Sequence, residues 1–449
     1  MCSENRSRGV FVASVVIMAF SFCHYSLAHG RATTRPDQRF VYGIIRIVYG
    51  CQEKGKSEKE KGKKVYKTIA NLTELNENEA MRIEKIELFH IELPLVHPFR
   101  TSMGTEMGRK IILIKVTAEG ITAWGECVAM SDPFYSADTV TSAWHTLTRY
   151  LIPLVLGKII YDPRDMVDLM KPVRGHVMAK AALENGVWAW FAEATEQPLS
   201  VLLGGVRDRV EVGVSIGIQP TIELLEERVA RFVDEGYQRV KMKVEPGWLI
   251  EPIERIRTKY PDLRLMGDAN SAFTLEDADL LRQIDPFGLL MLEQPLGHDD
   301  IANHARLQAQ IETAVCLDES IHSVADAQAM IDLKAGRIIN MKVGRVGGFS
   351  NALKIHDMAE AAGIQMWCGG MLETGIGRAG NVHLASLPNF VLPGDISATD
   401  RYFSRDIANP PFVLNKEDST MTVPTGKGLG VEIDVDFIES LTTDRAEFS

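Results

Sequence analysis

Three features of this 449-residue chain predict an α/β fold, a modified TIM barrel of (β/α)7β form with an N-terminal α+β capping domain. Apolar runs followed by helix-like stretches recur about every 25 residues in the second half, the length of one strand–loop–helix–loop unit. Runs with a period of two precede this repeat. A tail with strand and turn chemistry follows it and is expected to complete the capping domain.

The first 80 residues do not match the rest and form a non-conforming extension, residues 1–80. Segment 6–28 has the basic start, apolar run and small-residue cleavage site of a signal peptide. Residues 52–64 are a charged low-complexity run that cannot build a core. Met81 stands directly before the first strand-like run. Two interpretations stay open, namely upstream or disordered sequence before a start at Met81, or a segment that exports or anchors the protein.

The capping domain is expected over residues 81–205. The runs RIEKIELFHIELPL, RKIILIKVTA and GITAWGECV alternate with a period of two and predict an antiparallel meander, with a TAEG turn joining the last two. Helical patterns follow until the Gly204–Gly205 pair interrupts them.

The barrel is expected over residues 206–400, and the segment 401–449 is expected to pack back on the capping domain. Eight strand-like runs fit into the barrel: RVEVGVSIG, QRVKMKV, LRLMGDA, GLLMLEQP, AVCLDES, RIINMKV, IQMWCGG and LPGDIS. The helix after the eighth run is weak, which gives the (β/α)7β form.

The composition is that of an ordinary globular protein, with 45% hydrophobic and 24% charged residues. The net charge of −11 and the lack of a basic stripe argue against a nucleic-acid partner. We also expect no membrane contact for the folded domains. Cys127, Cys316 and Cys368 form no CxxC pair and are expected to be reduced, buried thiols of a cytoplasmic protein.

Five charged residues close successive apolar runs at intervals of 25, 25, 25 and 24: Lys243, Asp268, Glu293, Asp318 and Lys342. The carboxyl ends of barrel strands meet at one mouth, so the three carboxylates should converge there with a lysine on each side. Hard oxygen ligands suit Mg²⁺, for which Mn²⁺ can substitute. A single acid at a strand end would more simply be a solvated residue or a helix cap, but three at equal spacing favour a metal site.

The lysines are candidate bases. Period two places Lys241 and Lys243 on one face of the second strand, and strands two and six lie opposite each other in an eight-strand ring. Lys243 and Lys342 are therefore expected to face one another across the metal. A lysine acts as a base only when its pKa is depressed, which burial and a nearby cation favour.

A substrate carboxylate bound to the metal would acidify its own α-proton, because the cation stabilises the enediolate that forms. Metal-assisted hydrolysis is the main rival, but it usually recruits histidine ligands. The chain has no HxH motif, and His298 and His322 are most simply loop residues.

Six motifs in order, KMKVEPG, GDANSAFTL, MLEQPL, CLDESI, INMKVGRVGG and WCGGMLETGIGRA, resemble the enolase superfamily. More narrowly, they resemble its o-succinylbenzoate synthase / N-acylamino acid racemase branch, from Met81 to about residue 440. The resemblance implies that Lys243 and Lys342 are the acid/base pair and that the three carboxylates hold Mg²⁺. It further implies supporting or substrate-binding roles for Lys241, Asn270, Ser215, Glu319, Gly369, Gly370 and Met371, and a lid loop near Thr101–Gly104.

Two reactions fit such a site. One is the syn-dehydration of 2-succinyl-6-hydroxy-2,4-cyclohexadiene-1-carboxylate in menaquinone synthesis, which needs one lysine as base. The other is the racemisation of N-succinylamino acids, which needs both. Arg345 resembles a residue of the racemase-capable branch, so both activities are expected. A non-catalytic binding protein of this fold remains a remote alternative, and the family leads us to expect a symmetric homo-oligomer acting on a small carboxylate.

Overall fold

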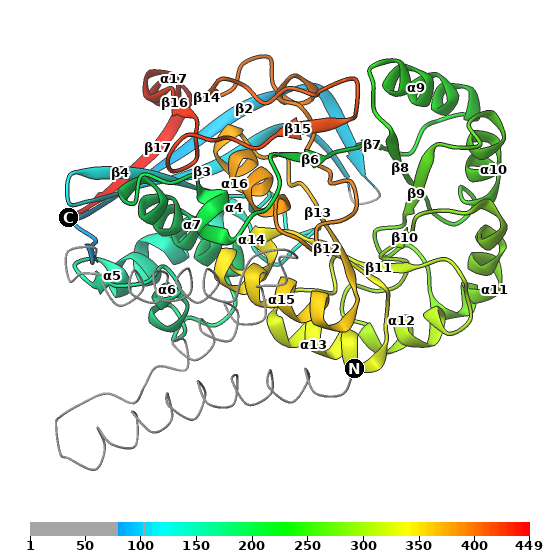
Figure 1. Cartoon of the computed structure of the whole chain (residues 1–449), viewed down its shortest axis with the longest axis horizontal. Helices are drawn as coiled ribbons and strands as arrows, with labels where there is room; N and C mark the ends of the chain where they lie inside the picture. Colours follow the sequence, from blue (N-terminus) through cyan, green and yellow to red (C-terminus); the bar gives the residue numbers. More distant parts are fainter. Residues whose placement is uncertain (1–79, 102–103) are drawn as a thin grey trace, which may run out of the picture. The chain divides into compact units, whose positions relative to one another are not determined.

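The computed structural model describes residues 80–101 and 104–449, with the backbone alone for residues 99–101 and 104. The signal-like segment and residues 102–103 of the expected lid loop therefore lie outside the described residues. The chain from Ala80 to Ser449 forms one unit of contacts, and its course is drawn in Figure 1.

A four-stranded antiparallel sheet forms the centre of the capping domain, in the order β17-β2-β3-β4. Its strands are β2 (Lys85–Thr101), β3 (Gly104–Ala118), β4 (Ile121–Cys127) and β17 (Thr442–Phe448). The predicted TAEG turn joins β3 and β4, where Glu119 and Gly120 adopt φ angles of 48° and 72°. Strand β17 adds to β2 at the edge, so the C-terminal tail completes this domain as predicted.

Both faces of this sheet are buried, because its strands alternate two apolar sets. Ile86, Leu88 and Ile114 face a core shared with the helices of the capping domain. Phe89 and Leu113 face the other way, toward apolar residues of the barrel half of the chain. The sheet is thus a middle layer that joins the two halves of the protein.

Helix α7 (Val177–Ala194) is the main helix of the capping domain. Its alanine-rich run favours a helix and leaves a small surface for close packing. At Gly125 of β4, a Cβ atom would overlap the carbonyl oxygen of Ala182, so glycine is what lets strand and helix approach. The opposite side of α7 carries Trp188, which packs in the barrel core.

The remaining elements of the capping domain are short. They are β1 (Met81–Arg82), α4 (Val140–Thr146), the π-helical turn Leu147–Leu151, α5 (Ile152–Val155), β5 (Ile159–Ile160), α6 (Asp165–Leu169) and α8 (Leu199–Leu203).

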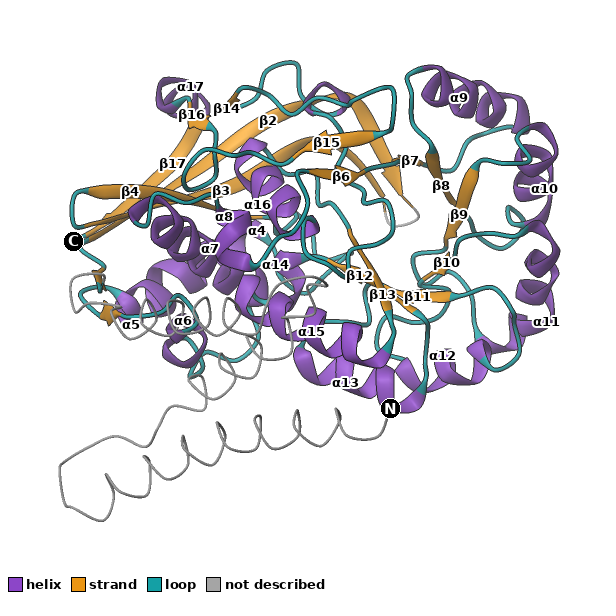
Figure 2. Ribbon diagram, in the orientation of Figure 1, coloured by secondary structure: helices purple, strands orange, loops and turns teal. Residues whose placement is uncertain are grey.

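The barrel half contains a seven-stranded parallel sheet in the sequential order β7 to β13. Its strands are β7 (Val214–Ile216), β8 (Arg239–Lys243), β9 (Arg264–Asp268), β10 (Leu292–Glu293), β11 (Val315–Leu317), β12 (Ile338–Met341) and β13 (Gln365–Cys368). The helices lie outside the curled sheet (Figure 2). They are α9 (Ile222–Asp234), α10 (Ile250–Lys259), α11 (Ala278–Leu281), α12 (Ile301–Gln308), α13 (Val324–Leu333), α14 (Val343–Val346), α15 (Phe349–Ala362) and α16 (Gly375–Ala385).

The first predicted barrel strand, RVEVGVSIG, is divided in the structure. Strand β6 (Arg209–Glu211) pairs with β15 (Thr420–Thr422), and only β7 joins the parallel sheet. The break falls at Gly213, where a Cβ atom would overlap the Arg239 side chain. The buried arginine therefore requires a glycine at this position.

The eighth predicted strand, LPGDIS, is not a regular strand in the described chain. It closes the ring through single bridges: Gly394 exchanges hydrogen bonds with Glu211 and Gly213, at 2.9 and 2.8 Å, and the Asp395 amide donates to the Cys368 carbonyl at 2.8 Å. The tail adds β14 (Ala408–Asn409), β16 (Glu432–Ile433) and α17 (Val435–Leu441).

Candidate active site

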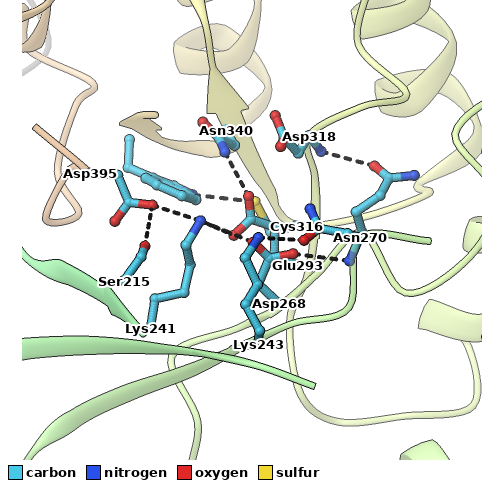
Figure 3. Close-up of polar contacts among 12 residues, drawn as sticks. Ser215, Lys241, Lys243, Asp268, Asn270, Glu293, Cys316, Asp318, Asn340 and Asp395 are labelled. Atoms are coloured by element: carbon cyan, nitrogen blue, oxygen red, sulfur yellow. Dashed lines mark hydrogen bonds and ion pairs between the residues drawn. The ribbon is translucent and has the colours of Figure 1, made fainter. Parts of the chain in front are cut away.

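The strand register brings the predicted residues together at the carboxyl ends of the strands. Lys243 pairs with Asp268 across β8 and β9, and Asp268 pairs with Glu293 across β9 and β10. Asp318 and Lys342 directly follow β11 and β12. All five therefore lie at one mouth of the barrel, as expected from the 25-residue spacing. Figure 3 shows four of them, Lys243, Asp268, Glu293 and Asp318.

Each of the two candidate bases contacts a different carboxylate. The Lys243 Nζ atom lies 2.6 Å from Asp268 Oδ2, and the Lys342 Nζ atom lies 2.8 Å from Asp318 Oδ2. Glu293 is completely buried between these pairs. The lysines thus lie on two sides of the carboxylate group.

The charge around the carboxylates differs from one to the next. Burial raises the pKa of Asp268, but Lys243 and Lys241 more than offset this, so the pKa lies below its ordinary value. Burial and the neighbouring Asp268 raise the pKa of Glu293. Glu293 is held by Lys241 at 3.0 Å and by the Asn340 amide at 2.7 Å.

Lys241 lies below Lys243 on the same strand and contacts three carboxylates. Its Nζ atom is 3.0 Å from Asp268, 3.0 Å from Glu293 and 2.6 Å from Asp395. Burial lowers the pKa of Lys241, but these three charges more than offset it, and the pKa lies well above its ordinary value. Lys241 therefore serves as a fixed positive charge in the barrel.

Asp395 is a member of the site that the sequence reasoning missed. It accepts a hydrogen bond from Ser215 at 2.8 Å and forms ion pairs with Arg239 at 2.7 Å and with Lys241 at 2.6 Å. The signal was present, since LPGDIS ends an eighth apolar run in an acid, as three other runs do. Ser215 itself lies in β7, beside Lys241.

Asn270 and Glu319 lie on the Lys243 side. The Asn270 side-chain oxygen accepts from Lys243, and its amide donates to Glu319 at 2.8 Å. Glu319 is buried, its Oε2 atom has no hydrogen-bond partner, and burial together with Asp268 raises its pKa. Both residues therefore extend the polar cluster beyond the three predicted ligands.

The Lys342 side is shared with the capping domain. The Tyr135 hydroxyl lies 2.9 Å from Lys342 Nζ and 3.1 Å from Arg345. Arg345 also donates to Asp318 and to the Asn340 carbonyl. Burial lowers the pKa of Lys342, but Tyr135 and Glu319 offset it, so the pKa lies above its ordinary value. The expected depression is thus not produced by these side chains and stays a prediction that depends on a bound cation.

The glycine-rich loop after β13 has structural reasons for its glycines. A Cβ atom at Gly369 would overlap the Asn340 side-chain oxygen, and one at Gly370 would lie 2.6 Å from the Asp395 carbonyl oxygen. Met371 is buried and packs with the core of the capping domain. This loop therefore joins the barrel mouth to the capping domain, and its contact with a substrate stays a prediction.

The histidines that metal-assisted hydrolysis would use lie apart from the carboxylates. His298 and His322 pack edge to face with ring centroids 6.5 Å apart. In the described part of the chain, neither ring hydrogen-bonds to the three predicted ligands. The donor set is accordingly one of hard oxygen atoms.

This donor set fits a divalent cation. Asp268, Glu293 and Asp318 are each at most 1% exposed and converge from three adjacent strands. Buried carboxylates need positive charge to compensate them, and here lysine amines occupy that role beside Asp268, Glu293 and Asp318. Hard divalent cations favour oxygen ligands of this kind.

Comparisons with known proteins agree with this architecture. Residues 85–204 match the mandelate racemase / muconate lactonizing enzyme N-terminal domain, and residues 224–437 match the enolase C-terminal domain-like family. An o-succinylbenzoate synthase from Geobacillus stearothermophilus is 46% identical over 81% of this chain and 96% of its own length. An N-succinylamino acid racemase from Amycolatopsis sp. is 46% identical over 81% of this chain and 99% of its own.

Among solved structures, an enolase superfamily member from Listeria innocua has a TM-score of 0.80 at 42% identity, covering 82% of this chain and 99% of its own. The chain belongs to the enolase superfamily. It is an enzyme, and membership implies a divalent metal ion at the site. No helix among the described residues is long and apolar enough to cross a membrane.

Proposed function

We propose that this enzyme is an o-succinylbenzoate synthase that dehydrates 2-succinyl-6-hydroxy-2,4-cyclohexadiene-1-carboxylate. The observation that carries the proposal is the placement of one lysine on each side of three converged carboxylates. Relatives with 42–46% identity over most of the chain bear this name. The placement supports the proposal because the reaction needs a positioned base beside a metal-bound substrate carboxylate.

In this proposal Asp268, Glu293 and Asp318 hold Mg²⁺, for which Mn²⁺ can substitute. A bound cation would polarise the substrate carboxylate and so acidify its α-proton. Lys243 removes that proton as general base, and Asn270 keeps its amine in place. Lys241 holds positive charge beside the reacting carboxylate and is itself fixed by Asp395.

Charge balance supports a doubly negative substrate. The charged interior of the barrel mouth contains five acids and five bases, Asp268, Glu293, Asp318, Glu319, Asp395, Lys241, Lys243, Lys342, Arg239 and Arg345. Their formal charges cancel while all ten are ionised, and Lys243 must give up its proton before it acts as the base. A divalent cation and a dicarboxylate substrate carry equal and opposite charge, so binding both adds no net charge to the buried site.

Racemisation of N-succinylamino acids is the second candidate. It is favoured by Lys342, which lies on the opposite side of the carboxylates from Lys243 and is held by Asp318 and Tyr135. A base on each face permits proton removal from either enantiomer. We infer that the enzyme catalyses both reactions on one site.

The test of the proposal is metal-dependent activity on both substrates. Excess chelator is expected to abolish activity, and Mg²⁺ or Mn²⁺ to restore it. Glu293→Gln is expected to lose bound metal, measured by elemental analysis, while its circular dichroism spectrum remains that of the wild type. Full activity in excess chelator would contradict the proposal. Turnover of neither substrate would instead indicate the alternative, a non-catalytic binding protein of the same fold.

We further propose a cytoplasmic location and a symmetric homo-oligomer. The three described cysteines, Cys127, Cys316 and Cys368, are free and buried, which suits a reducing compartment. Fractionation of the source cells and light scattering of the purified protein test these two points. A monomer in solution, or recovery outside the cytoplasm, contradicts the respective statement.

A further inference from the structure

Two carboxylates of the capping domain end inside the barrel half of the chain. Glu126 lies on β4 and Glu184 lies on α7, and both are almost completely buried. In the described part of the chain, neither shares a hydrogen bond or an ion pair with the predicted metal ligands. Each instead accepts hydrogen bonds from the first residues of a barrel helix.

Glu126 caps the start of α16. Its carboxylate accepts from the Thr374 amide at 3.0 Å, the Thr374 hydroxyl at 2.6 Å and the Gly377 amide at 2.8 Å. A Cβ atom at Gly377 would lie 2.9 Å from Glu126, so this glycine admits the carboxylate. The helix thus receives a cap from a residue nearly 250 positions earlier in the chain.

Glu184 does the same for α15. It accepts from the amides of Phe349 and Ser350, at 2.8 and 2.9 Å, and from the Ser350 hydroxyl. The residue before this helix, Gly348, has a φ angle of 113°, and a Cβ atom there would overlap Glu184. The Trp188 indole also donates to Glu184 at 2.8 Å and fixes its orientation.

Helices are normally capped by the residue just before them, and α16 keeps such a cap, because the Thr374 hydroxyl accepts from the Ile376 amide at 3.3 Å and Asp406 accepts from the Gly375 amide at 2.7 Å. A carboxylate suits the position, since amides at a helix start have no partner in the helix and carry partial positive charge. Glu126 and Glu184 add partners from a different domain. The two contacts therefore fix where α15 and α16 begin relative to the capping domain.

The loops that lead into these helices bear the predicted site residues. Lys342 precedes the short helix α14, which leads into α15. Within α14, a Cβ atom at Gly344 would overlap Val128 of the capping domain. The segment that connects Lys342 to the Glu184 cap therefore packs closely against that domain.

The loop into α16 contains Met371, whose amide donates to Glu373 at 2.8 Å. Glu373 is in turn bound by the Asn381 amide of α16 at 2.8 Å. A shift of the α16 start would accordingly move the wall formed by residues 369–371.

We propose that Glu126 and Glu184 are positioning residues through which the capping domain places Lys342 and the loop of residues 369–371. Glu184 places Lys342, and Glu126 places the Met371 wall of the substrate pocket. This inference rests on the proposed function for its kinetic consequences, and its geometric part can be tested without it.

The test compares Glu126→Gln and Glu184→Gln with Asp285→Asn. Asp285 is a matched control, because it also accepts from two loop amides and one threonine hydroxyl, those of Glu312 and Thr313, at 2.7 to 3.0 Å. Its partners precede β11 and so lie at the opposite end of the strands from the active site. Ser350→Ala, which removes one donor to Glu184, is a milder variant in case the glutamine variant does not fold.

The first readout is deuterium uptake at the α-carbon of each N-succinylamino acid enantiomer. The ratio between enantiomers does not depend on how much enzyme is folded, so loss of stability alone leaves it unchanged. Glu184→Gln is expected to lower exchange of the enantiomer that faces Lys342 about tenfold relative to the other. Glu126→Gln is expected to raise KM about fivefold with kcat within twofold. Asp285→Asn is expected to change neither.

The second readout is amide hydrogen exchange of the metal-loaded proteins, followed by mass spectrometry. Segments around Ser350 or Thr374 are expected to exchange faster in the corresponding variant only. Unchanged exchange in both segments, or wild-type enantiomer ratio and KM in both folded variants, would overturn the inference. A wild-type protein that turns over neither substrate would instead contradict the proposed function, and the amide exchange would still decide the positioning.

Discussion

The two sides of the active site are built from different parts of the chain. On one side, Lys243 is held by Asp268 and Asn270, which both come from the barrel. On the other, Lys342 contacts Tyr135 of the capping domain as well as Asp318. Among the described contacts, one base is therefore held by barrel residues, whereas the other is also held by a residue of the capping domain.

This difference shows that the symmetry of the two lysines does not extend to their supports. The strand ends place both amines at comparable depth, since each is 9% exposed as a side chain. Among the described residues, only Lys342 of the two hydrogen-bonds to a side chain of the capping domain. The predictions that follow separate the two sides, beginning with the largest effect.

Replacement of the barrel-supported base has the largest expected effect. Lys243→Ala is expected to reduce both dehydration and racemisation by on the order of 10⁴-fold, because the general base is removed. Turnover of both substrates by the purified variant measures this. Lys259→Ala, which removes an exposed lysine paired with Glu226, serves as the control. Substantial dehydration by the Lys243 variant would show that another group is the base.

Lys342→Ala is expected to be severe but asymmetric. Racemisation is expected to fall by on the order of 10³-fold, since proton transfer at one face is lost. Exchange in deuterated water, one enantiomer at a time, should be retained for the enantiomer that faces Lys243. The two-base interpretation is wrong if the Lys243 and Lys342 variants both exchange both enantiomers at the wild-type rate.

The pH dependence of stability tests the two carboxyls through which the capping domain contacts the barrel. Burial raises the pKa of Glu126 and of Glu184 to about 7, from an ordinary value of 4.5. For Glu126, Glu373 raises the pKa further and Arg109 faces it from β3. The folded protein therefore binds more protons than the unfolded chain between pH 4.5 and 7, and the free energy of unfolding falls as the pH rises through this window.

Each carboxyl is expected to contribute roughly 3 kcal/mol to this fall, at about 1.4 kcal/mol per pKa unit. Urea denaturation at pH 5 and pH 8 measures it. Glu184→Gln is expected to flatten the difference, whereas the control Asp285→Asn should not, since the pKa of Asp285 is lowered. If the free energy of unfolding changes equally between pH 5 and pH 8 in the wild type and in Glu184→Gln, the assignment of the raised pKa is contradicted.

Tyr135→Phe has the smallest expected effect. It removes the hydroxyl contacts with Lys342 and Arg345 but keeps the ring, whose centroid lies 4.5 Å from the Lys342 amine. The loss of one hydrogen bond is worth about 1 kcal/mol, or roughly fivefold in rate. We expect this reduction only for the enantiomer that faces Lys342. An equal effect on both enantiomers would mean that Tyr135 does not act through this lysine.

Much of the barrel side could be predicted from sequence, because its information is local and periodic. The 25-residue repeat and the apolar run before each charged residue place Lys243, Asp268 and Glu293 at neighbouring strand ends. Parallel register then converts equal spacing into proximity. The TAEG turn was predictable for the same reason, since a hairpin turn is read from four adjacent residues.

The capping-domain side could not be predicted in this way. Tyr135 and Glu184 meet the barrel through contacts between residues more than 160 positions apart, and no periodicity records them. The eighth strand was overestimated because its apolar pattern does not reveal that only single bridges form there. The division of the first strand at Gly213 was missed because it reflects two different long-range partners, β15 for β6 and β8 for β7.

The closure of the strand ring at Gly394 and Asp395 has a consequence for how the enzyme fails. Neighbouring barrel strands are joined by ladders, but this seam consists of isolated hydrogen bonds and the ion pair with Arg239. Local opening begins where the fewest bonds must break. Because Asp395 also anchors Lys241, a gap at the seam releases a charge from the centre of the site. Heat or denaturant should therefore abolish catalysis while most of the fold is still intact, so that the enzyme loses activity before it unfolds globally.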